Sequence, residues 1–387
     1  MEQLKKNLEK HLHELCLFPS RHVGSPGVKA AADYVEKTFR ELGFKLVAQE
    51  PFPSTGWRFG SMRFADLDNA CREVPGALPC FFSRSTDVSG VPVWLDRAAL
   101  DGLKKEQVEN KLCIVDFFSD AADIRGRNGI AEELDSLGAA AAVFISDPAY
   151  HTPCAASTKI QRSAHLQRLG AAAVAQEGAF YLAQNRHHRY HLCIDADTFA
   201  AVSHNVTAVR PGTGLKRAVF GAHIDAAPLT QGAGDNASGT ACLLEMARLL
   251  KEELPDWTFD FAAFDAEEYC ITHLPVGSEA YVQAHPDRRW YFFMDFDNLG
   301  AAWGEQVLHL GREELLPELK SRYPFAPFKN GGDDRSFDAL GIPTLWYNSE
   351  TPFKVFHTPL DTVSTLDISK MADCIADAVA VTRQLCR

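Results

Sequence analysis

Hydrophobic residues near the N-terminus recur at the spacing of an amphipathic helix. Val28, Ala31, Val35 and Phe39 are three or four positions apart, which places their side chains on one helix face. Gly43 follows at the position where many helices end, and the apolar segment 44–48 comes next. The chain is therefore expected to open with a helix followed by a strand.

After about residue 200, apolar segments alternate with stretches of helical spacing. The expected strands are residues 205–209, 218–222, 258–264, 290–296 and 342–347. The expected helices carry Leu243, Ala247, Leu250 and Leu254, and then Met371, Ile375 and Val379. Strands that are apolar on both faces and separated by helices are typical of parallel sheets. The sequence predicts an α/β fold with a mostly parallel sheet flanked by helices.

The middle of the chain has a different pattern. Residues 134–143 and 166–175 are similar alanine-rich stretches, and each looks like the end of a helix that turns into a strand. We interpret residues 57–198 as an inserted, smaller α/β or β-rich domain. Residues 1–56 and 199–387 then form the main domain.

Composition and charge exclude several classes of protein. Among 387 residues, 39 Lys and Arg stand against 51 Asp and Glu, a net charge of -12. That charge repels a nucleic acid backbone, so we expect no nucleic acid partner. The longest apolar run, Leu137 to Ile145, is far shorter than the ~20 residues of a membrane-spanning helix, so we expect no membrane partner.

The N-terminal residues 1–11 mix both charge signs and lack the apolar stretch of a secretory signal. The sequence as given therefore predicts a cytoplasmic protein. A secreted protein whose leader has been removed is the alternative.

Histidines and carboxylates follow the predicted strands, where ligands bind in open α/β sheets. They are His223 and Asp225, Asp235, Glu267 and Glu268, Asp297 with Asp295 as the competing choice, and His357. Each has an ordinary structural explanation when taken singly, such as Asp235 capping the helix that follows it. Two histidines and three carboxylates together match the nitrogen and oxygen ligands of zinc better than a phosphate or flavin pocket. Five ligands exceed one closed site, so a two-metal centre bridged by one carboxylate is the economical interpretation.

Seven motifs in this order resemble the zinc-dependent aminopeptidases of metallopeptidase family 28. They are F-P-S-R-H-V-G-S-P-G, G-A-H-I-D, G-D-N-A-S-G, A-F-D-A-E-E, F-D-N-L-G, G-D-D-R-S-F-D-A-L-G-I-P and H-T-P-L-D-T. The resemblance implies the zinc exopeptidase fold and two zinc ions per chain. One ion would be held by His223, Asp235 and Asp297, and the other by Asp235, Glu268 and His357, with Asp235 bridging.

By the same resemblance, Glu267 would be the general base, Asp225 would support His223 from behind, and the peptide bond from Asp235 to Asn236 would be cis. The insertion is similar to protease-associated domains in segments 108–118 and 131–146. Such a domain would cover the rim of the catalytic cleft as a lid.

The chain departs from the family pattern near the proposed site. Gly332 to Ser336 replace the usual Ser-Asp-His before Phe337, and the added Asp333 and Asp334 could bind the free ammonium group of a substrate. The segment from Tyr269 to Val276 is longer than usual and would bring Cys270 and His273 toward the metals, although ordinary loop variation explains it equally well. Tyr347 is a candidate oxyanion donor.

These observations predict a metal-dependent aminopeptidase that removes N-terminal residues from peptide substrates. Two zinc ions would activate a water molecule, and Glu267 would act as its general base. A glutaminyl cyclase or another amide hydrolase is the alternative on the same fold, and cyclases of that type use one zinc. A non-catalytic receptor is disfavoured because all five ligands and the base are present.

Overall fold

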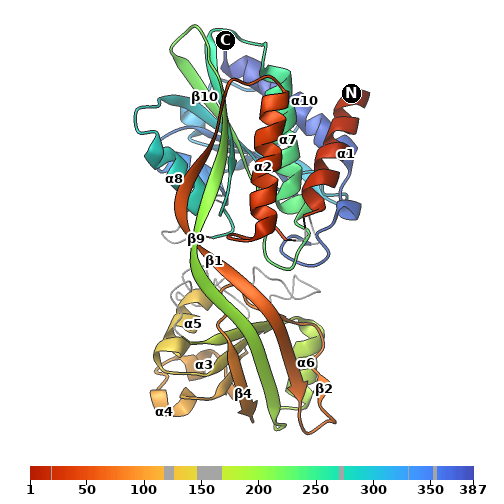
Figure 1. The fold of residues 1–387 in the computed structure, drawn as a ribbon, viewed down its shortest axis with the longest axis vertical. Coiled ribbons are helices and arrows are strands. Elements are labelled where there is room, and N and C mark those ends of the chain that lie inside the picture. The colour runs from red at the N-terminus through yellow and green to blue at the C-terminus, as the bar shows by residue number, and fades with distance from the viewer. Residues whose placement is uncertain (19, 117–125, 146–167, 270–273, 330, 352–354) are drawn as a thin grey trace.

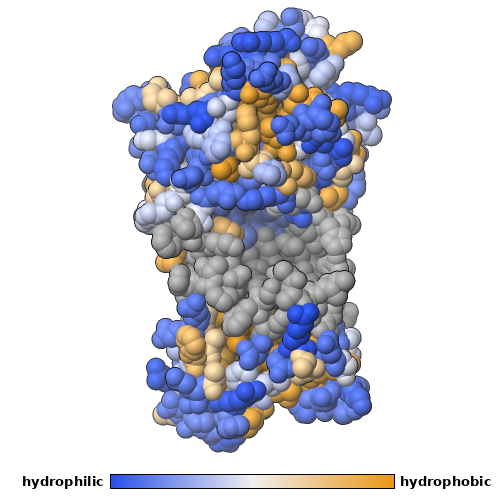
Figure 2. Space-filling view, turned by 180° about the vertical axis from the view of Figure 1, so that it is seen from behind, coloured by the Kyte–Doolittle hydropathy of each residue, from blue (hydrophilic) through white to orange (hydrophobic). Residues whose placement is uncertain are grey.

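The computed structural model describes residues 1–18, 20–116, 126–145, 168–269, 274–329, 331–351 and 355–387. Two lobes are connected by the long strands β1 (Leu46–Asp66) and β9 (Tyr190–Arg210), which run through both of them (Figure 1). Both chain termini lie in the larger lobe. Hydrophilic residues cover most of the described surface on the far side (Figure 2).

A mixed sheet with the strand order β14-β13-β15-β12-β10-β11-β9-β1-β2 extends from the larger lobe into the smaller one, where β2 pairs with β1 and β4 pairs with β9 (Figure 1). Its remaining strands are β2 (Arg72–Glu73), β4 (Thr86–Gly90), β10 (Lys216–His223), β11 (Trp257–Phe264), β12 (Trp290–Phe296), β13 (Glu305–Gly311), β14 (Phe325–Pro327) and β15 (Thr344–Glu350). The central strands β11, β10, β12 and β15 are parallel, whereas β9 and β13 pair antiparallel with this centre. The predicted parallel sheet is therefore the middle of a larger mixed sheet.

Helices cover both faces of this sheet. One face packs against α1 (Glu2–Cys16), α2 (Pro26–Glu41), α7 (Gly239–Leu250) and α10 (Ile368–Leu385). The other face packs against α8 (Val276–Ala284) and α9 (Asp334–Asp338). Along β10, Ala218 and Phe220 belong to the first core while Val219 between them belongs to the second. Side chains alternate across a strand, so an apolar strand supplies both cores.

Helix α2 begins and ends at residues whose local sequence explains its bounds. The Ser25 side chain accepts a hydrogen bond from the Val28 backbone amide, and Pro26 occupies the first helical position, where its missing N–H costs nothing. After the helix, Gly43 adopts a φ of 95°, which glycine reaches without steric penalty. The predicted helix followed by a strand is confirmed, but the chain opens with another helix, α1, which the sequence pattern did not predict.

The smaller lobe has its own sheet with the order β3-β8-β7-β6-β5. Its strands are β3 (Ala77–Pro79), β5 (Val93–Leu95), β6 (Leu112–Val115), β7 (Ala141–Ile145) and β8 (Gly170–Val174), and its helices are α3 (Arg97–Leu100), α4 (Lys105–Val108), α5 (Gly126–Ser136) and α6 (Gln176–Gln184). The two alanine-rich stretches supply β7 and β8, which pair parallel from Ala141 with Gly170 onward.

The predicted domain borders fall inside β1 and β9. Gly56 pairs with Phe199 and Trp57 pairs with Thr198, so the two borders lie opposite one another on a continuous antiparallel ribbon. The division at 57–198 and the likeness of this segment to a protease-associated domain stay predictions.

The ribbon also gives carboxylate partners to two histidines near the start of β9. His188 Nδ1 lies 2.8 Å from Asp66 Oδ2, and His191 Nε2 lies 2.8 Å from Asp87 Oδ1. The aspartates lie beside these histidines because β1 and β4 both pair with β9. In the described part of the chain, no helix has the length and apolar character needed to cross a membrane.

Candidate active site

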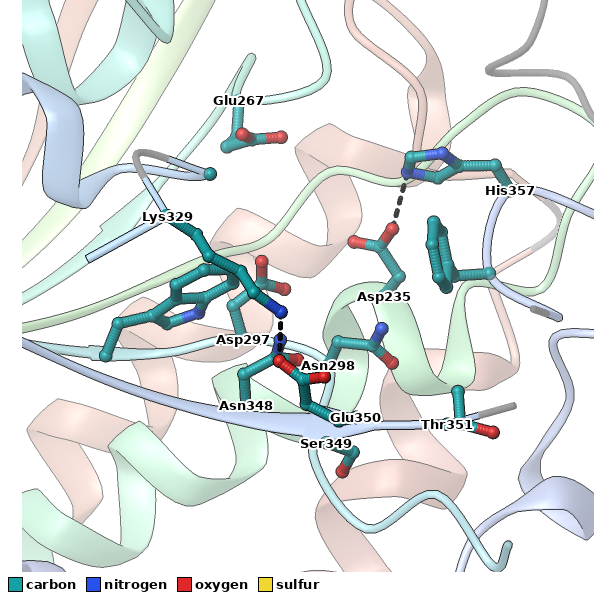
Figure 3. A pocket seen from close by; sticks show the side chains of 13 residues that line it. Asp235, Glu267, Asp297, Asn298, Lys329, Asn348, Ser349, Glu350, Thr351 and His357 are labelled. Carbon is teal, nitrogen blue, oxygen red and sulfur yellow. Dashed lines mark hydrogen bonds and ion pairs between the residues drawn. The ribbon is translucent and has the colours of Figure 1, made fainter. Parts of the chain in front are cut away.

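The candidate site lies at the carboxyl ends of the central parallel strands. His223 is the last residue of β10, Glu267 and Glu268 follow β11, and Asp297 follows β12. Parallel strands end at one edge of the sheet, so residues far apart in sequence meet there. The turn before α7 and the loop after β15 add Asp235 and His357 (Figure 3).

Two trios of ligand-type atoms share one carboxylate. His223 Nε2 lies 3.0 Å from Asp235 Oδ1 and 3.3 Å from Asp297 Oδ1. His357 Nε2 lies 2.5 Å from Asp235 Oδ2 and 2.9 Å from Glu268 Oε1. Within each trio, the candidate ligand atoms are within 4.8 Å of one another. Asp235 therefore presents one oxygen to each trio, which is the geometry of a bridging ligand.

The buried atoms of the first trio fit a metal ion. His223 Nε2 and Asp297 Oδ1 are inaccessible to solvent and have no hydrogen-bond partner. A buried polar atom without a partner is costly, and coordination of a cation would relieve that cost. Asp297, and not the competing Asp295, belongs to this trio.

The pKa values of these groups are shifted by burial and by the charges of their neighbours. Burial would lower the pKa of His223, but Asp225, Asp235 and Asp297 outweigh it and hold that pKa well above the ordinary value. Burial opposes ionisation of Asp235, yet His357 and His223 hold its pKa well below the usual range. Burial raises the pKa of Asp297. Metal binding requires a neutral imidazole and ionised carboxylates, so it would displace the proton of His223.

Asp225 supports both the first histidine and the two glutamates. Its Oδ1 lies 3.3 Å from His223 Nδ1, behind the ring. Its two oxygens accept hydrogen bonds from the backbone amides of Glu267 and Glu268, both at 3.1 Å. This one carboxylate therefore couples the end of β10 to the turn that carries the proposed base.

The G-D-N-A-S-G motif places Asp235 through its neighbours. The peptide bond between Asp235 and Asn236 is cis, as predicted. The Asn236 side chain donates to the Phe296 carbonyl and accepts from the Gly239 amide, both at 2.8 Å. A Cβ on Gly239 would lie 1.9 Å from the Phe296 carbonyl oxygen, so only glycine allows α7 to start this close to β12.

Two buried residues that sequence analysis left unassigned hold the Asp235 turn from both sides. The Arg21 guanidinium donates hydrogen bonds to the carbonyls of Leu15, Ile224, Gln231 and Gly232, at 2.7 to 3.1 Å. Asp361 accepts hydrogen bonds from the amides of Gly234 at 2.7 Å and Asp235 at 3.1 Å. Both residues lie inside motifs that carried the family resemblance, but local patterns did not indicate their roles.

Comparisons with known proteins point to the same part of the chain. Residues 205–382 match the model of peptidase family M28. This segment contains all five candidate ligands and Glu267.

Over residues 205–382 the chain is similar to peptidase family M28.

Individual relatives extend the similarity. The aminopeptidase YwaD of Bacillus subtilis is 32% identical over 135 residues, which are 34% of this chain and 28% of that protein. An aminopeptidase of Pseudomonas aeruginosa strain UCBPP-PA14 is 25% identical over 316 residues, 73% of this chain and 54% of that protein. The chain thus spans less than two thirds of the length of these curated relatives. Among solved structures, the zinc aminopeptidase BSAP of Bacillus subtilis has a TM-score of 0.75 at 19% identity, covering 97% of this chain and 94% of that one.

The two aspartates that depart from the M28 pattern lie beneath the site. Asp333 and Asp334 are 1% and 0% exposed, and neither lines the pocket at the trios. Burial and the nearby Glu267 raise the pKa of Asp333 well above its usual value. Their burial does not support the expectation that they bind a substrate ammonium group, which stays a prediction. The expected effect of Cys270 and His273 concerns residues outside the described ones.

Tyr347 does not point toward the site either. Its hydroxyl donates a hydrogen bond of 2.8 Å to Asp377 Oδ2 on α10, and the side chain is fully buried in the core. Side chains alternate along a strand, so Trp346 and Asn348 line the pocket while Tyr347 faces the opposite layer. The assignment of Tyr347 as an oxyanion donor is wrong.

We expect Tyr347→Phe to leave kcat within about twofold of the parent. The variant should lose about 1 to 2 kcal/mol of unfolding free energy, because a buried hydrogen bond to a carboxylate is removed. Steady-state kinetics and urea denaturation measure both effects. A tenfold fall in kcat would reinstate a role for the hydroxyl in the reaction.

Proposed function

We propose that this chain is a metal-dependent aminopeptidase that hydrolyses the N-terminal peptide bond of peptides. The observation that carries the proposal is the pair of trios sharing Asp235 beside a pocket lined by Glu267. Histidine and carboxylate donors suit zinc, and we propose two zinc ions per chain. His223, Asp235 and Asp297 would hold one ion, and Asp235, Glu268 and His357 the other.

Bound metals at this site would lower the pKa of a water molecule and polarise the scissile carbonyl. The chain itself provides the proton transfer. Glu267 is 7% exposed and lines the pocket, and the hydrogen bond from its amide to Asp225 keeps its backbone in place. We propose that its carboxylate accepts the proton of the attacking water and delivers it to the leaving amine.

A panel of aminoacyl-anilides, assayed with and without a chelator, tests the proposal. We expect release of the aniline, loss of activity after chelation, recovery with zinc, and two zinc ions per chain by elemental analysis. One zinc per chain together with cyclised N-terminal glutamine would favour the glutaminyl cyclase alternative. Failure of the zinc-loaded protein to release any aniline would overturn the proposal.

A further inference from the structure

The carboxylate of Glu267 has a cationic neighbour that belongs to neither metal trio. Nη2 of Arg335 lies 3.9 Å from Oε1 of Glu267, and these side chains are 19% and 9% exposed. Charges that are largely removed from water attract one another more strongly than exposed pairs do. Arg335 is not among the residues that line the pocket, whereas Glu267 is (Figure 3). The structure therefore connects the guanidinium to the reaction through Glu267 and not through a substrate contact.

The guanidinium is carried by a well-anchored helix. Arg335 lies in α9, and its Nε donates a hydrogen bond of 3.2 Å to the Gly332 carbonyl just before that helix. Two positions further on, Phe337 is fully buried and stacks on Phe293 of β12, with ring centroids 3.9 Å apart. A group on a rigid element keeps a defined position, so Arg335 offers the Glu267 carboxylate a fixed partner.

Two neighbours act on the Glu267 carboxylate in opposite directions. The amide of Glu267 donates to Asp225, which fixes the backbone but not the torsions of the side chain. Burial and the charge of Glu267 raise the pKa of Asp333 well above its usual value, so these two carboxyl groups repel each other when both are ionised. Arg335 attracts the Glu267 carboxylate and counteracts this repulsion.

We propose that Arg335 is a positioning residue that holds the Glu267 carboxylate at the edge of the pocket, oriented for proton transfer. It lies in the segment from Gly332 to Ser336, where the chain departs from the family pattern, so the contact does not follow from the resemblance. The inference rests on the proposed aminopeptidase function and deepens it, because it names the residue that orients the proposed base.

Arg335→Gln is expected to lower kcat by about 10- to 100-fold, since small displacements of catalytic groups have effects of this size. KM and zinc content should stay within about twofold of the parent, because Arg335 neither lines the pocket nor belongs to a trio. Arg335→Lys keeps the charge without the forked geometry and should recover part of kcat, leaving a loss of about three- to tenfold. Kinetics of the zinc-loaded proteins, on the aminoacyl-anilide that the parent cleaves fastest, and elemental analysis measure these effects.

The double variant Glu267→Gln/Arg335→Gln tests whether the guanidinium acts through the base. The amide of the glutamine carries no charge for the guanidinium to hold. Arg335→Gln should therefore change the residual kcat of Glu267→Gln by less than about twofold. An equal loss in both backgrounds would show that the two residues act independently and would overturn the inference.

Arg312→Gln is the matched control and should keep the parental kcat. The Arg312 guanidinium also binds α9, through an ion pair of 3.0 Å and a backbone hydrogen bond of 2.7 Å to Asp338, the last residue of the helix.

A parental kcat in Arg335→Gln, or loss of its zinc, overturns this inference alone, whereas failure of the zinc-loaded parent to release any aniline overturns the proposed function. If Arg335→Gln fails to fold, Arg335→Lys decides the question, and a kcat equal to that of the parent contradicts the inference.

Discussion

Glu267→Gln is expected to lower kcat by about 10²- to 10⁴-fold, or about 3 to 5 kcal/mol of barrier, while the fold and the two proposed metal ions are retained. The amide preserves the volume of the side chain and removes the proposed proton acceptor for the water. Glu267 belongs to neither metal trio, so its replacement should leave metal occupancy unchanged. Kinetics on the zinc-loaded protein and elemental analysis measure the two effects.

The adjacent Glu268→Gln is the matched comparison. Glu268 Oε1 lies 2.9 Å from His357 Nε2 in the second trio, so this variant should lose metal from that trio together with activity. If Glu267→Gln retains the parental kcat, the role of base is wrongly assigned. If it loses metal while Glu268→Gln does not, the two roles are exchanged.

Arg21→Met is expected to lower the unfolding free energy by about 3 to 5 kcal/mol. The parent guanidinium, 1% exposed, donates to four carbonyl groups, and methionine would leave these buried acceptors without donors. Because methionine carries no charge, the variant no longer has to desolvate a buried guanidinium, and this offsets part of the loss in unfolding free energy. Zinc affinity should also fall, because the carbonyls of Gln231 and Gly232 precede the bridging Asp235. Urea denaturation and zinc titration provide the measurements.

Two further variants make this result interpretable. Arg21→Lys keeps the charge but loses the forked donor geometry, so its loss of stability should be intermediate. Arg58 is exposed on β1, and Arg58→Met should change stability by no more than about 0.5 kcal/mol. A loss below 1 kcal/mol in Arg21→Met would show that the Asp235 turn holds its position without the guanidinium.

Strand β15 was predicted from the sequence, but the direction of its side chains was not. Its apolar run predicted a strand, and the structure has one at Thr344–Glu350. Which face of the strand meets the pocket depends on the layers packed around it. Tyr347 was assigned to the site and instead bonds to Asp377, whereas Trp346 and Asn348 were not singled out and line the pocket.

The residues whose roles could not be predicted from the sequence make their contacts with distant parts of the chain. Arg21 and Gln231 are 210 positions apart, and no local periodicity links them. The long strands β1 and β9 were likewise not predicted at their full extent, because each crosses from one lobe to the other and is recognised through its pairing partner.

The sequence by itself determined the parallel centre of the sheet, the helices α2, α7 and α10, and the ligand-type residues at the strand ends. It could do so because hydrophobic periodicity encodes local elements and because parallel strands bring their carboxyl ends to one edge. Only the tertiary structure decided that Asp235 presents one oxygen to each trio, that Asp333 and Asp334 are buried, and that Asn348 faces the pocket. These features depend on side-chain directions and on contacts between distant segments, which are set when the layers pack.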